Sequence, residues 1–422
     1  MAPGGQIWRA AEAVAGDTAR GPALSASYEG AAAAIAAARA HATLRAGAEV
    51  VDISAERDIL WFDRAERRLR QTRARAILVA TGAMERPVAF PGWTLPGVSG
   101  AGALQIALKQ GGLVPEGPVV LAGQGPLLLL LAAQLDALGA EIGAMLHFGP
   151  PLPPRAALAR LPAALRADAA LLGKGVALSL RRQTLAPLYR RVQNLRATGT
   201  DAVEAVHFEA DGMAESVPVA RLAVHDGVVP NTQLTRLLGL DHRWIAAQAA
   251  FAPIVDDDGA TSREGIFVAG DGAGIGGAVL AARSGRRVAA AICRALGASA
   301  GAAVPPPPAR RAARDFVDVL YAPRPVSAFA RDDTLLCRCE SVTFGDVRRV
   351  VRLGATGPNR VKTATRCGMG PCQGRMCGGN LNRLIGEETG SPPEAVGALR
   401  IRPPLKPILL GDYAALAADD AA

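Results

Sequence analysis

The sequence predicts an α/β fold followed by a small, mainly helical domain, and three observations support this prediction. Apolar runs that end in glycine turns occur at residues 75–82, 118–125 and 265–274. A buried strand that leads through a glycine turn into a helix is the first half of a βαβ unit. Five of the six cysteines lie in the last hundred of the 422 residues, after a proline-rich break in composition. The chain is long enough for two or three domains.

The first predicted element is a buried strand, RAILVATG at residues 75–82, which ends in a tight turn at Thr81 and Gly82. Residues 83–102 follow with three prolines and several glycines. Proline and glycine at this density interrupt helices and strands. We therefore expect a loop that crosses between domains.

The second element is a buried strand, PVVLA at residues 118–122, followed by GQGPLL and a long apolar helix. Gly123, Gly125 and Pro126 stand where a G-x-G-x-x-G turn would bring a pyrophosphate to the helix N-terminus. Leu128 replaces the third glycine, and the next strand, IGAMLHFG, ends without the acidic residue that holds a ribose. Dinucleotide binding and a purely structural turn are equally good interpretations of this motif.

The third element, residues 265–292, repeats this pattern with a strand that ends at Gly270 and Asp271 and a helix that begins near Gly277. Asp271, followed by Gly272, is placed to accept a hydrogen bond from a cofactor hydroxyl. It could equally cap N–H groups at the start of a helix.

The composition changes at residues 297–314, where four consecutive prolines predict a stiff polyproline spacer. After it, residues 342–355 have valines on one helical face and arginines on the other, which predicts an amphipathic helix. The boundary of the cysteine-rich domain is therefore expected near residue 330.

The cysteines of this last domain form two short pairs, a C-x-C pair at Cys337 and Cys339 and a C-x4-C pair at Cys372 and Cys377. Two loops that each present two thiolates to one point suit a [2Fe-2S] cluster. The glycines around the second pair allow the backbone to approach the cluster and donate hydrogen bonds to its sulfurs. Cys367 is the spare, and we expect a buried thiol beside the cluster.

Structural zinc and disulfide bonds are the alternative uses of these cysteines. Zinc also binds four cysteines, but its sites favour C-x2-4-C pairs in both halves. A disulfide framework is disfavoured because residues 1–16 contain no secretory leader and a reducing, cytoplasmic compartment is expected.

The charge of the chain does not indicate a nucleic-acid partner. Its net charge is +9, but only four of its 47 basic residues are lysines, and no stretch interleaves basic and aromatic residues. The longest apolar run is broken by the GQGP turn and is too short to span a membrane. Neither nucleic acid nor a transmembrane segment is expected.

Four segments, taken in order, resemble the flavoproteins with two dinucleotide-binding domains: PGGQIWR at 3–9, ATGAMERPVAFPGW at 80–93, VVPNTQL at 228–234 and GIFVAGDGAG at 265–274. With the cysteine motif, the chain is similar to the alpha or A subunits of heteromeric flavin-dependent amine and amino-acid dehydrogenases. This group includes the A subunit of opine oxidase, the B subunit of hydrogen cyanide synthase and the alpha subunit of proline dehydrogenase. The last domain resembles the [2Fe-2S] domain of bacterioferritin-associated ferredoxin (BFD).

The resemblance implies an FAD-binding domain at residues 1–115 and 250–300 and an NAD(P)-like domain at 116–249. A proline-rich linker at 301–330 and a BFD-like [2Fe-2S] domain at 331–422 would follow. The resemblance also implies residues that contact FAD. Together with the GQGP turn, the full set of expected cofactor-binding residues is Gly4, Gly5, Gln6, Thr81, Gly82, Gly123, Gly125, Pro126, Gly270, Asp271 and Gly272.

The similar proteins begin with a strand, a G-x-G-x-x-G turn and a helix ahead of the PGGQ segment, whereas this sequence starts just before that segment. The FAD-binding domain is therefore expected to be incomplete. The alternatives are a fragment, a misplaced start or a real loss of FAD binding. We expect one of the first two, and weak binding of FAD by the chain as given.

By resemblance, the chain is an electron-transfer subunit with FAD and a [2Fe-2S] cluster, and NAD(P) or ATP are candidates for its second nucleotide site. A flavoprotein beta or B subunit would oxidise the C–N bond of an amine, amino acid or opine. The alternatives are an iron–sulfur carrier or structural subunit without flavin activity, and an NAD(P)H-dependent reductase of the nitrite-reductase type. No catalytic acid, base or nucleophile is identified, and the five histidines lie outside catalytic motifs.

Overall fold

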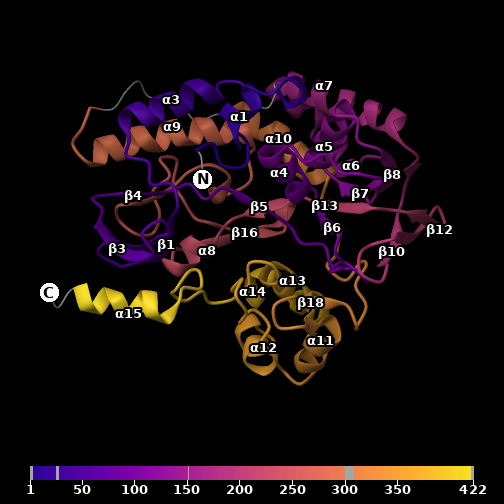
Figure 1. The fold of residues 1–422 in the computed structure, drawn as a ribbon. Coiled ribbons are helices and arrows are strands. Elements are labelled where there is room, and N and C mark those ends of the chain that lie inside the picture. Colours follow the sequence, from indigo (N-terminus) through magenta and orange to yellow (C-terminus); the bar gives the residue numbers. More distant parts are fainter. Residues whose placement is uncertain (1–2, 25–27, 151, 300–307, 420–422) are drawn as a thin grey trace.

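The computed structural model describes residues 3–24, 28–150, 152–299 and 308–419, and its largest sheet is parallel (Figure 1). In spatial order its strands are β6 (Val98–Gly100), β13 (Arg221–Asp226), β7 (Val119–Gln124), β8 (Ile142–His147) and β9 (Leu188–Tyr189). Every neighbouring pair is parallel. β7 is buried at every position, which is why its sequence is a continuous apolar run. The predicted strand at 118–122 is confirmed.

The two faces of this sheet are covered by different layers. Val119 and Leu121 pack against α4 (Ala101–Gly111) and α5 (Pro126–Ala137). The alternate residues, Val120 and Ala122, face an antiparallel sheet. Its strands are β10 (Gln193–Thr198), β11 (Ala205–Ala210) and β12 (Met213–Pro218). Side chains of a strand alternate between faces, so one apolar run serves both layers.

A second body is built around the parallel pair β4 (Ile77–Val79) and β17 (Ile266–Val268). Both predicted strands are confirmed. Their core joins strands β1 (Ala48–Ile53) and β2 (Asp58–Asp63) to α8 (Gln233–Leu237). Strand β3 (Arg68–Arg73) pairs with β2 in the same antiparallel sheet. Helix α9 (Ala278–Ala295) begins after Gly277, as predicted, and packs on β17.

Shorter elements complete these two bodies. Small antiparallel pairs join β5 (Ala83–Glu85) to β14 (Val228–Pro230) and β15 (His242–Ile245) to β16 (Ala250–Pro253). The remaining elements are α1 (Ala11–Ala15), α2 (Arg20–Leu24), α3 (Ala31–His41), α6 (Arg155–Leu158), α7 (Leu161–Leu185), η2 (Ala246–Gln248) and η3 (Gly270–Ala273).

Two features differ from the domain boundaries predicted from sequence. β6 and α4 lie before the boundary predicted at 115–116, yet β6 pairs with β13 in the five-stranded parallel sheet and α4 packs in the core of that sheet. The stretch predicted as a proline-rich linker contains helix α10 (Pro308–Leu320), whose Ala313 and Phe316 pack against α6 and α7. Most of the proline run lies outside the described residues. Both the placement of β6 and α4 and the formation of α10 depend on contacts between residues far apart in the sequence, which local composition cannot predict.

The cysteine-rich domain forms a separate lobe beside these bodies (Figure 1). It consists of the pair β18 (Leu335–Cys337) and β19 (Val342–Thr343) and helices α11 (Phe344–Arg352), α12 (Pro358–Thr365), α13 (Gly378–Thr389) and α14 (Pro393–Val396). The predicted amphipathic helix is α11, and its Val347 and Val351 are buried. A final helix, α15 (Leu410–Asp419), returns to β3.

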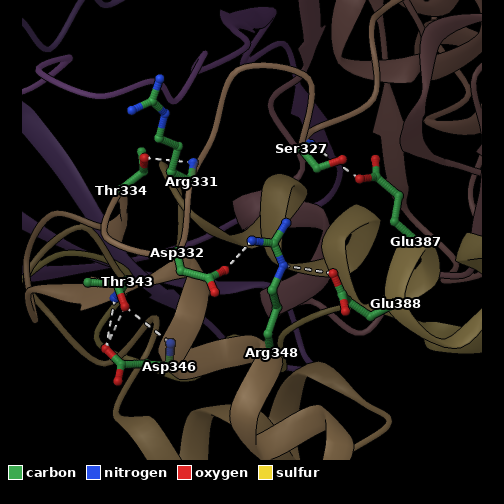
Figure 2. Close-up of polar contacts among 9 residues, drawn as sticks. All are labelled: Ser327, Arg331, Asp332, Thr334, Thr343, Asp346, Arg348, Glu387 and Glu388. Carbon is green, nitrogen blue, oxygen red and sulfur yellow. Dashed lines mark hydrogen bonds and ion pairs between the residues drawn. The ribbon is translucent and has the colours of Figure 1, made fainter. Parts of the chain in front are cut away.

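Hydrogen bonds fix the lobe internally and against the rest of the chain. Figure 2 shows Arg348 of α11 bound to Asp332 and Glu388, which joins the start of the lobe to α13. Trp93 Nε1 donates to Leu335 O at 2.8 Å across the boundary between the lobe and the body of the parallel sheet. The lobe is therefore docked on the body.

The start of α11 is a complete capping box. Thr343 Oγ1 accepts the Asp346 N–H at 3.1 Å, and Asp346 Oδ2 accepts the Thr343 N–H at 3.1 Å (Figure 2). We expect Thr343→Ala to remove about 1 kcal/mol of local stability. Amide hydrogen exchange in α11 should then become about fivefold faster. Thr363→Ala, in an exposed residue of α12 that caps nothing, is the matched control, and unchanged α11 exchange in the Thr343 variant would contradict the prediction.

Candidate functional site

Three cysteines of the lobe lie together in its core. The Sγ atoms of Cys337, Cys367 and Cys377 all lie within 4.8 Å of one another, and all three residues are buried. Cys337 ends strand β18, Cys377 precedes α13, and Cys367 follows α12. The ends of these three elements therefore meet at the group of three thiols.

The thiols of this group share protons unequally. Hydrogen bonds from Cys367 and Cys377 lower the pKa of Cys337 to about 2. The hydrogen bond to Cys337 raises the pKa of Cys367 to about 12 and also raises the pKa of Cys377. One thiolate that accepts two thiol hydrogen bonds is a soft, anionic centre, which is the donor set of zinc and iron–sulfur sites.

Cys339 and Cys372 lie at the more exposed side of this group. A backbone hydrogen bond from Cys372 lowers the pKa of Cys339, but partial burial and the neighbouring Cys372 thiol outweigh it, so the net shift is upward. A Cβ at Gly370 would lie only 2.2 Å from Cys339 Cβ. A glycine at position 370 is thus required for the two cysteine loops to approach each other.

The five thiols fit an iron–sulfur cluster in number and in softness. The structure groups two of the four predicted ligands, Cys337 and Cys377, with Cys367, and places Cys339 and Cys372 beside them. The ligand set predicted from the pair spacing therefore stays a prediction. The burial of Cys367 agrees with its expected place beside the site.

The residues expected to contact FAD in the β4–β17 body come together. A Cβ at Gly272 would lie 3.6 Å from Thr81 Oγ1 and from Gly82 N. Asp271 Oδ1 accepts the N–H groups of Gly276 and Gly277, each at 2.9 Å, just before α9. Oδ2 of this aspartate has no hydrogen-bond partner among the described residues. The local capping role is therefore real, and one carboxylate oxygen stays available for a ligand.

The segment that contains Gly4, Gly5 and Gln6 is held elsewhere. Lys109 of α4 donates its Nζ to the Gln6 and Ile7 carbonyls at 3.2 and 3.1 Å. In the described part of the chain, no hydrogen bond joins this segment to the turn at Thr81. Its predicted place beside the flavin stays a prediction.

The GQGP turn forms as predicted, with Gly125 before α5 and Pro126 as its first residue, but the chain itself covers the carboxyl edge of the sheet there. Gln124 Nε2 donates to Asp226 Oδ1 at 2.8 Å and to Ala322 O at 3.0 Å. The Arg324 N–H donates to Asp226 Oδ2 at 3.1 Å, and its guanidinium donates to Phe148 O at 2.7 Å. Residues 321–326 therefore cross the ends of β7, β8 and β13.

Helix α10 continues this cover into the space between the two bodies. One side packs on α6 and α7, which follow β8. On the other side, Asp318 accepts a hydrogen bond from Gln248 Nε2 at 2.8 Å, and Gln248 also donates to Ile275 O at 2.9 Å in the β17 body. Sequence reasoning missed this helix, although Ala313, Phe316 and Leu320 already have helical spacing.

A short series of hydrogen bonds connects the turn at Thr81 to the cysteine loop, residues 367–377. Thr81 Oγ1 donates to Asn231 O at 3.1 Å, and the Asn231 N–H donates to Gly82 O at 2.9 Å. Two residues later, Gln233 Nε2 donates to Gln373 O at 3.3 Å, next to Cys372. The VVPNTQ segment thus lies between the predicted flavin turn and the cysteine loop.

Three histidines have hydrogen-bond partners or a shifted pKa that follow from their surroundings. His225 is buried with its Nδ1 2.5 Å from Glu85 Oε1, and Glu85 Oε2 accepts the Gly102 N–H. Burial lowers the pKa of His147 and of His242 to about 4, so both are neutral at pH 7. His242 is hydrogen-bonded to Thr235 and to the Leu240 carbonyl, and His147 Nδ1 lies 3.4 Å from Arg182 Nη1, so these histidines have partners within the structure.

Comparison with known families agrees with this geometry. Residues 12–292 match the pyridine nucleotide-disulphide oxidoreductase family, and residues 335–387 match the BFD-like [2Fe-2S] binding domain. In the described residues, no helix combines the length and the apolar character that crossing a membrane requires.

Two curated relatives match over most of their length. The A subunit of opine oxidase from Rhizobium meliloti strain 1021 is 39% identical over 435 residues, which cover 98% of this chain and 91% of that protein. The HcnB subunit of hydrogen cyanide synthase from Pseudomonas aeruginosa is 34% identical, covering 87% and 81%.

Among solved structures, L-proline dehydrogenase from P. horikoshii is similar with a TM-score of 0.61 and 20% identity, over 87% of this chain and 64% of that one. This likeness shows the fold. The predicted architecture, an α/β flavoprotein followed by a [2Fe-2S] domain, is confirmed. The chain belongs to the pyridine nucleotide-disulphide oxidoreductase family, and within it to the group that contains the A subunit of opine oxidase.

Proposed function

We propose that the chain is the electron-transfer subunit, with FAD and a [2Fe-2S] cluster, of a heteromeric oxidoreductase that acts on a C–N bond. The relatives named as subunits of opine oxidase and of hydrogen cyanide synthase support this proposal. The substrate class would be an amino acid or opine. The partner would be a flavoprotein beta or B subunit, and the location the cytoplasm.

The observation that carries the proposal is the contact between the cysteine loop and the body built around β4 and β17, here called the flavin-type body. Gln233, two residues after Asn231 at the Thr81 turn, donates to Gln373 O in the cysteine loop at 3.3 Å. This contact brings the cysteine loop against the segment beside the predicted flavin turn, as electron transfer between the two would require.

Different residues would hold the two cofactors. A flavin, when bound, exchanges two electrons with an organic substrate, whereas a [2Fe-2S] cluster exchanges one at a time. Cys337, Cys339, Cys372 and Cys377 would hold the cluster. The FAD would lie against the turn at Thr81 and Gly82, with Asp271 as an acceptor for its hydroxyl groups and Gly270 and Gly272 allowing close approach.

Iron content and electron uptake test this function. We expect the anaerobically purified full chain to contain about two irons, and its cluster to take up about one electron from dithionite in addition to about two for each FAD that is bound. The reduced cluster should give the electron paramagnetic resonance (EPR) signal of a [2Fe-2S] centre. A Cys337→Ser, Cys377→Ser double variant is the control and should lack the signal. Zinc in place of iron, or no electron uptake, would overturn the electron-transfer function.

Single substitutions test the ligand set. Cys339→Ser and Cys372→Ser should each lose most of the cluster absorbance, because a hard oxygen ligand replaces a soft thiolate. Cys367→Ala should retain iron at the wild-type ratio. Cys293→Ser, in α9 and remote from the lobe, is the matched control. Loss of iron from the Cys367 variant together with retention in the Cys339 variant would show that Cys367 is the ligand instead.

We also propose that the second nucleotide cleft is closed by the chain itself. In this fold a dinucleotide lies across the carboxyl ends of the strands. Those ends are covered by residues 321–326, and α10 fills the space between the two bodies. This argues against the reductase of the nitrite-reductase type, since electrons could not enter from NAD(P)H.

A fluorescence titration checks this closure. We expect no saturable binding of NADH or NADPH, and none of ATP in a parallel dialysis, up to about 1 mM, the upper end of ordinary cofactor affinities. An NADH-dependent dehydrogenase serves as the positive control. Saturable NADH binding, accompanied by faster amide exchange in α10, would show instead that the helix is a displaceable cover.

A further inference from the structure

The lobe contains one more cysteine than a [2Fe-2S] cluster needs. Such a cluster takes four thiolates, and the proposed ligands are Cys337, Cys339, Cys372 and Cys377. Cys367 is the fifth cysteine, and its side chain is fully buried in the apolar core of the lobe. Its Sγ atom nevertheless lies within 4.8 Å of the Sγ atoms of two proposed ligands. Its thiol is therefore part of the site without being needed as a ligand.

The backbone on both sides of Cys367 fixes the position of its side chain. Arg366, before it, ends α12 in the left-handed conformation, with a φ of 66°. Gly368, after it, has a φ of 88°, and a Cβ there would lie 2.7 Å from Leu399 Cδ1, so only glycine fits. The Cys367 N–H donates to Thr365 Oγ1 at 3.2 Å. This tight turn holds the thiol in the core of the lobe.

The turn supplies two hydrogen-bond donors to the sulfur of Cys337. That sulfur accepts hydrogen bonds from the thiols of Cys367 and Cys377. It also accepts the backbone N–H groups of Gly368 and Glu340. Two adjacent residues, 367 and 368, thus donate to the same atom, one from its side chain and one from its backbone.

Of the two thiols that donate to Cys337, only that of Cys367 would keep its proton when a cluster is bound. A cysteine binds iron as the thiolate, so Cys377 gives up its proton as a ligand. Cys367 is outside the proposed ligand set, and a free buried cysteine is a small apolar group with a weak S–H donor. Its S–H group therefore stays directed at the sulfur of Cys337.

A hydrogen bond to a ligand sulfur changes the free energy of reduction of a cluster. Reduction adds one electron, which makes the ligand sulfurs more negative. A donor stabilises the more negative state more strongly, because hydrogen bonds to charged acceptors are the stronger ones. Hydrogen bonds to the sulfurs are among the factors that set the potential of iron–sulfur clusters. The expected effect of the additional donor is a higher potential.

We propose that Cys367 is a hydrogen-bond donor that acts through the ligand Cys337 and raises the reduction potential of the [2Fe-2S] cluster. The proposal rests on the electron-transfer function and deepens it. A higher potential of the cluster favours electron flow from a flavin to the cluster over flow in the opposite direction. Because the thiol is fully buried, this effect belongs to the chain itself and needs no partner subunit.

A redox titration of the anaerobically purified full chain, followed by the EPR signal of the reduced cluster, tests the proposal. Cys367→Ala removes the donor, and Cys367→Ser replaces the S–H group by an O–H donor. In Cys367→Ala we expect the ratio of reduced to oxidised cluster at a fixed potential to fall roughly threefold to tenfold, the size of one net hydrogen bond. A tenfold fall corresponds to about 59 mV for a one-electron centre. Cys367→Ser should restore most of the difference.

Val361→Ala is the control for packing. Val361 is also fully buried in the core of the lobe and lies on α12, six residues before Cys367. Its truncation removes buried volume near the site but no hydrogen-bond donor, so this variant should keep the wild-type potential. An equal fall in Val361→Ala and Cys367→Ala, or in both Cys367 variants, would identify loosened packing as the cause and contradict the proposal.

Iron content, measured on the same samples, separates a failure of this proposal from a failure of the electron-transfer function. Loss of iron from Cys367→Ala would make Cys367 a ligand, which rules out the donor role but leaves the function standing. An unchanged or higher potential in a fully loaded Cys367→Ala has the same meaning. Zinc in the wild-type chain, or no uptake of electrons by it, would overturn the function and this proposal together.

Discussion

The buried carboxylate of Asp226 is the interaction on which the arrangement of the domains depends. This residue, 4% exposed, ends β13 and accepts hydrogen bonds from Gln124 in the sheet and from the backbone of Arg324 in the covering segment. Its carbonyl accepts from Arg86, which also holds η2 of the flavin-type body. Arg383 of the cysteine lobe donates to the Arg324 carbonyl. A buried carboxylate needs hydrogen-bond donors, and these contacts together join the four parts of the chain.

That fixed position matters for electron transfer between the lobe and the flavin-type body. The lobe is held by Trp93, Asn380 and Arg383, which bond to residues on the opposite side of the boundary. The cysteine loop then contacts Gln233, which lies two residues after Asn231, the hydrogen-bond partner of the Thr81 turn. A rigid docking of this kind keeps two redox groups at a constant separation, which a flexible linker between independent domains could not do.

Sequence patterns correctly predicted the strands and helices that form because of the apolar pattern of their own residues. The apolar runs at 118–122 and 265–270 are buried strands, and the valines of α11 face the core of the lobe. The pairing of β6 with β13 could not be predicted, because the two strands are more than a hundred residues apart. Helix α10 was hidden by the proline run before it, although its own apolar spacing was helical. The packing of Cys367 against Cys337 and Cys377 depends on three elements and has no local signal.

The GQGP turn has a structural reason for its first glycine that does not depend on a ligand. A Cβ at Gly123 would lie 1.9 Å from the carbonyl oxygen of His225, and the backbone φ at this glycine is 137°. No other residue fits there, because β7 and β13 approach each other closely at their carboxyl ends. The first glycine is thus required by the sheet whether or not a dinucleotide binds. Leu128, at the position of the third glycine, is buried in the helix-side core. The turn therefore has a role in the packing of this fold, and residues 321–326 lie across the end of β7 beside it.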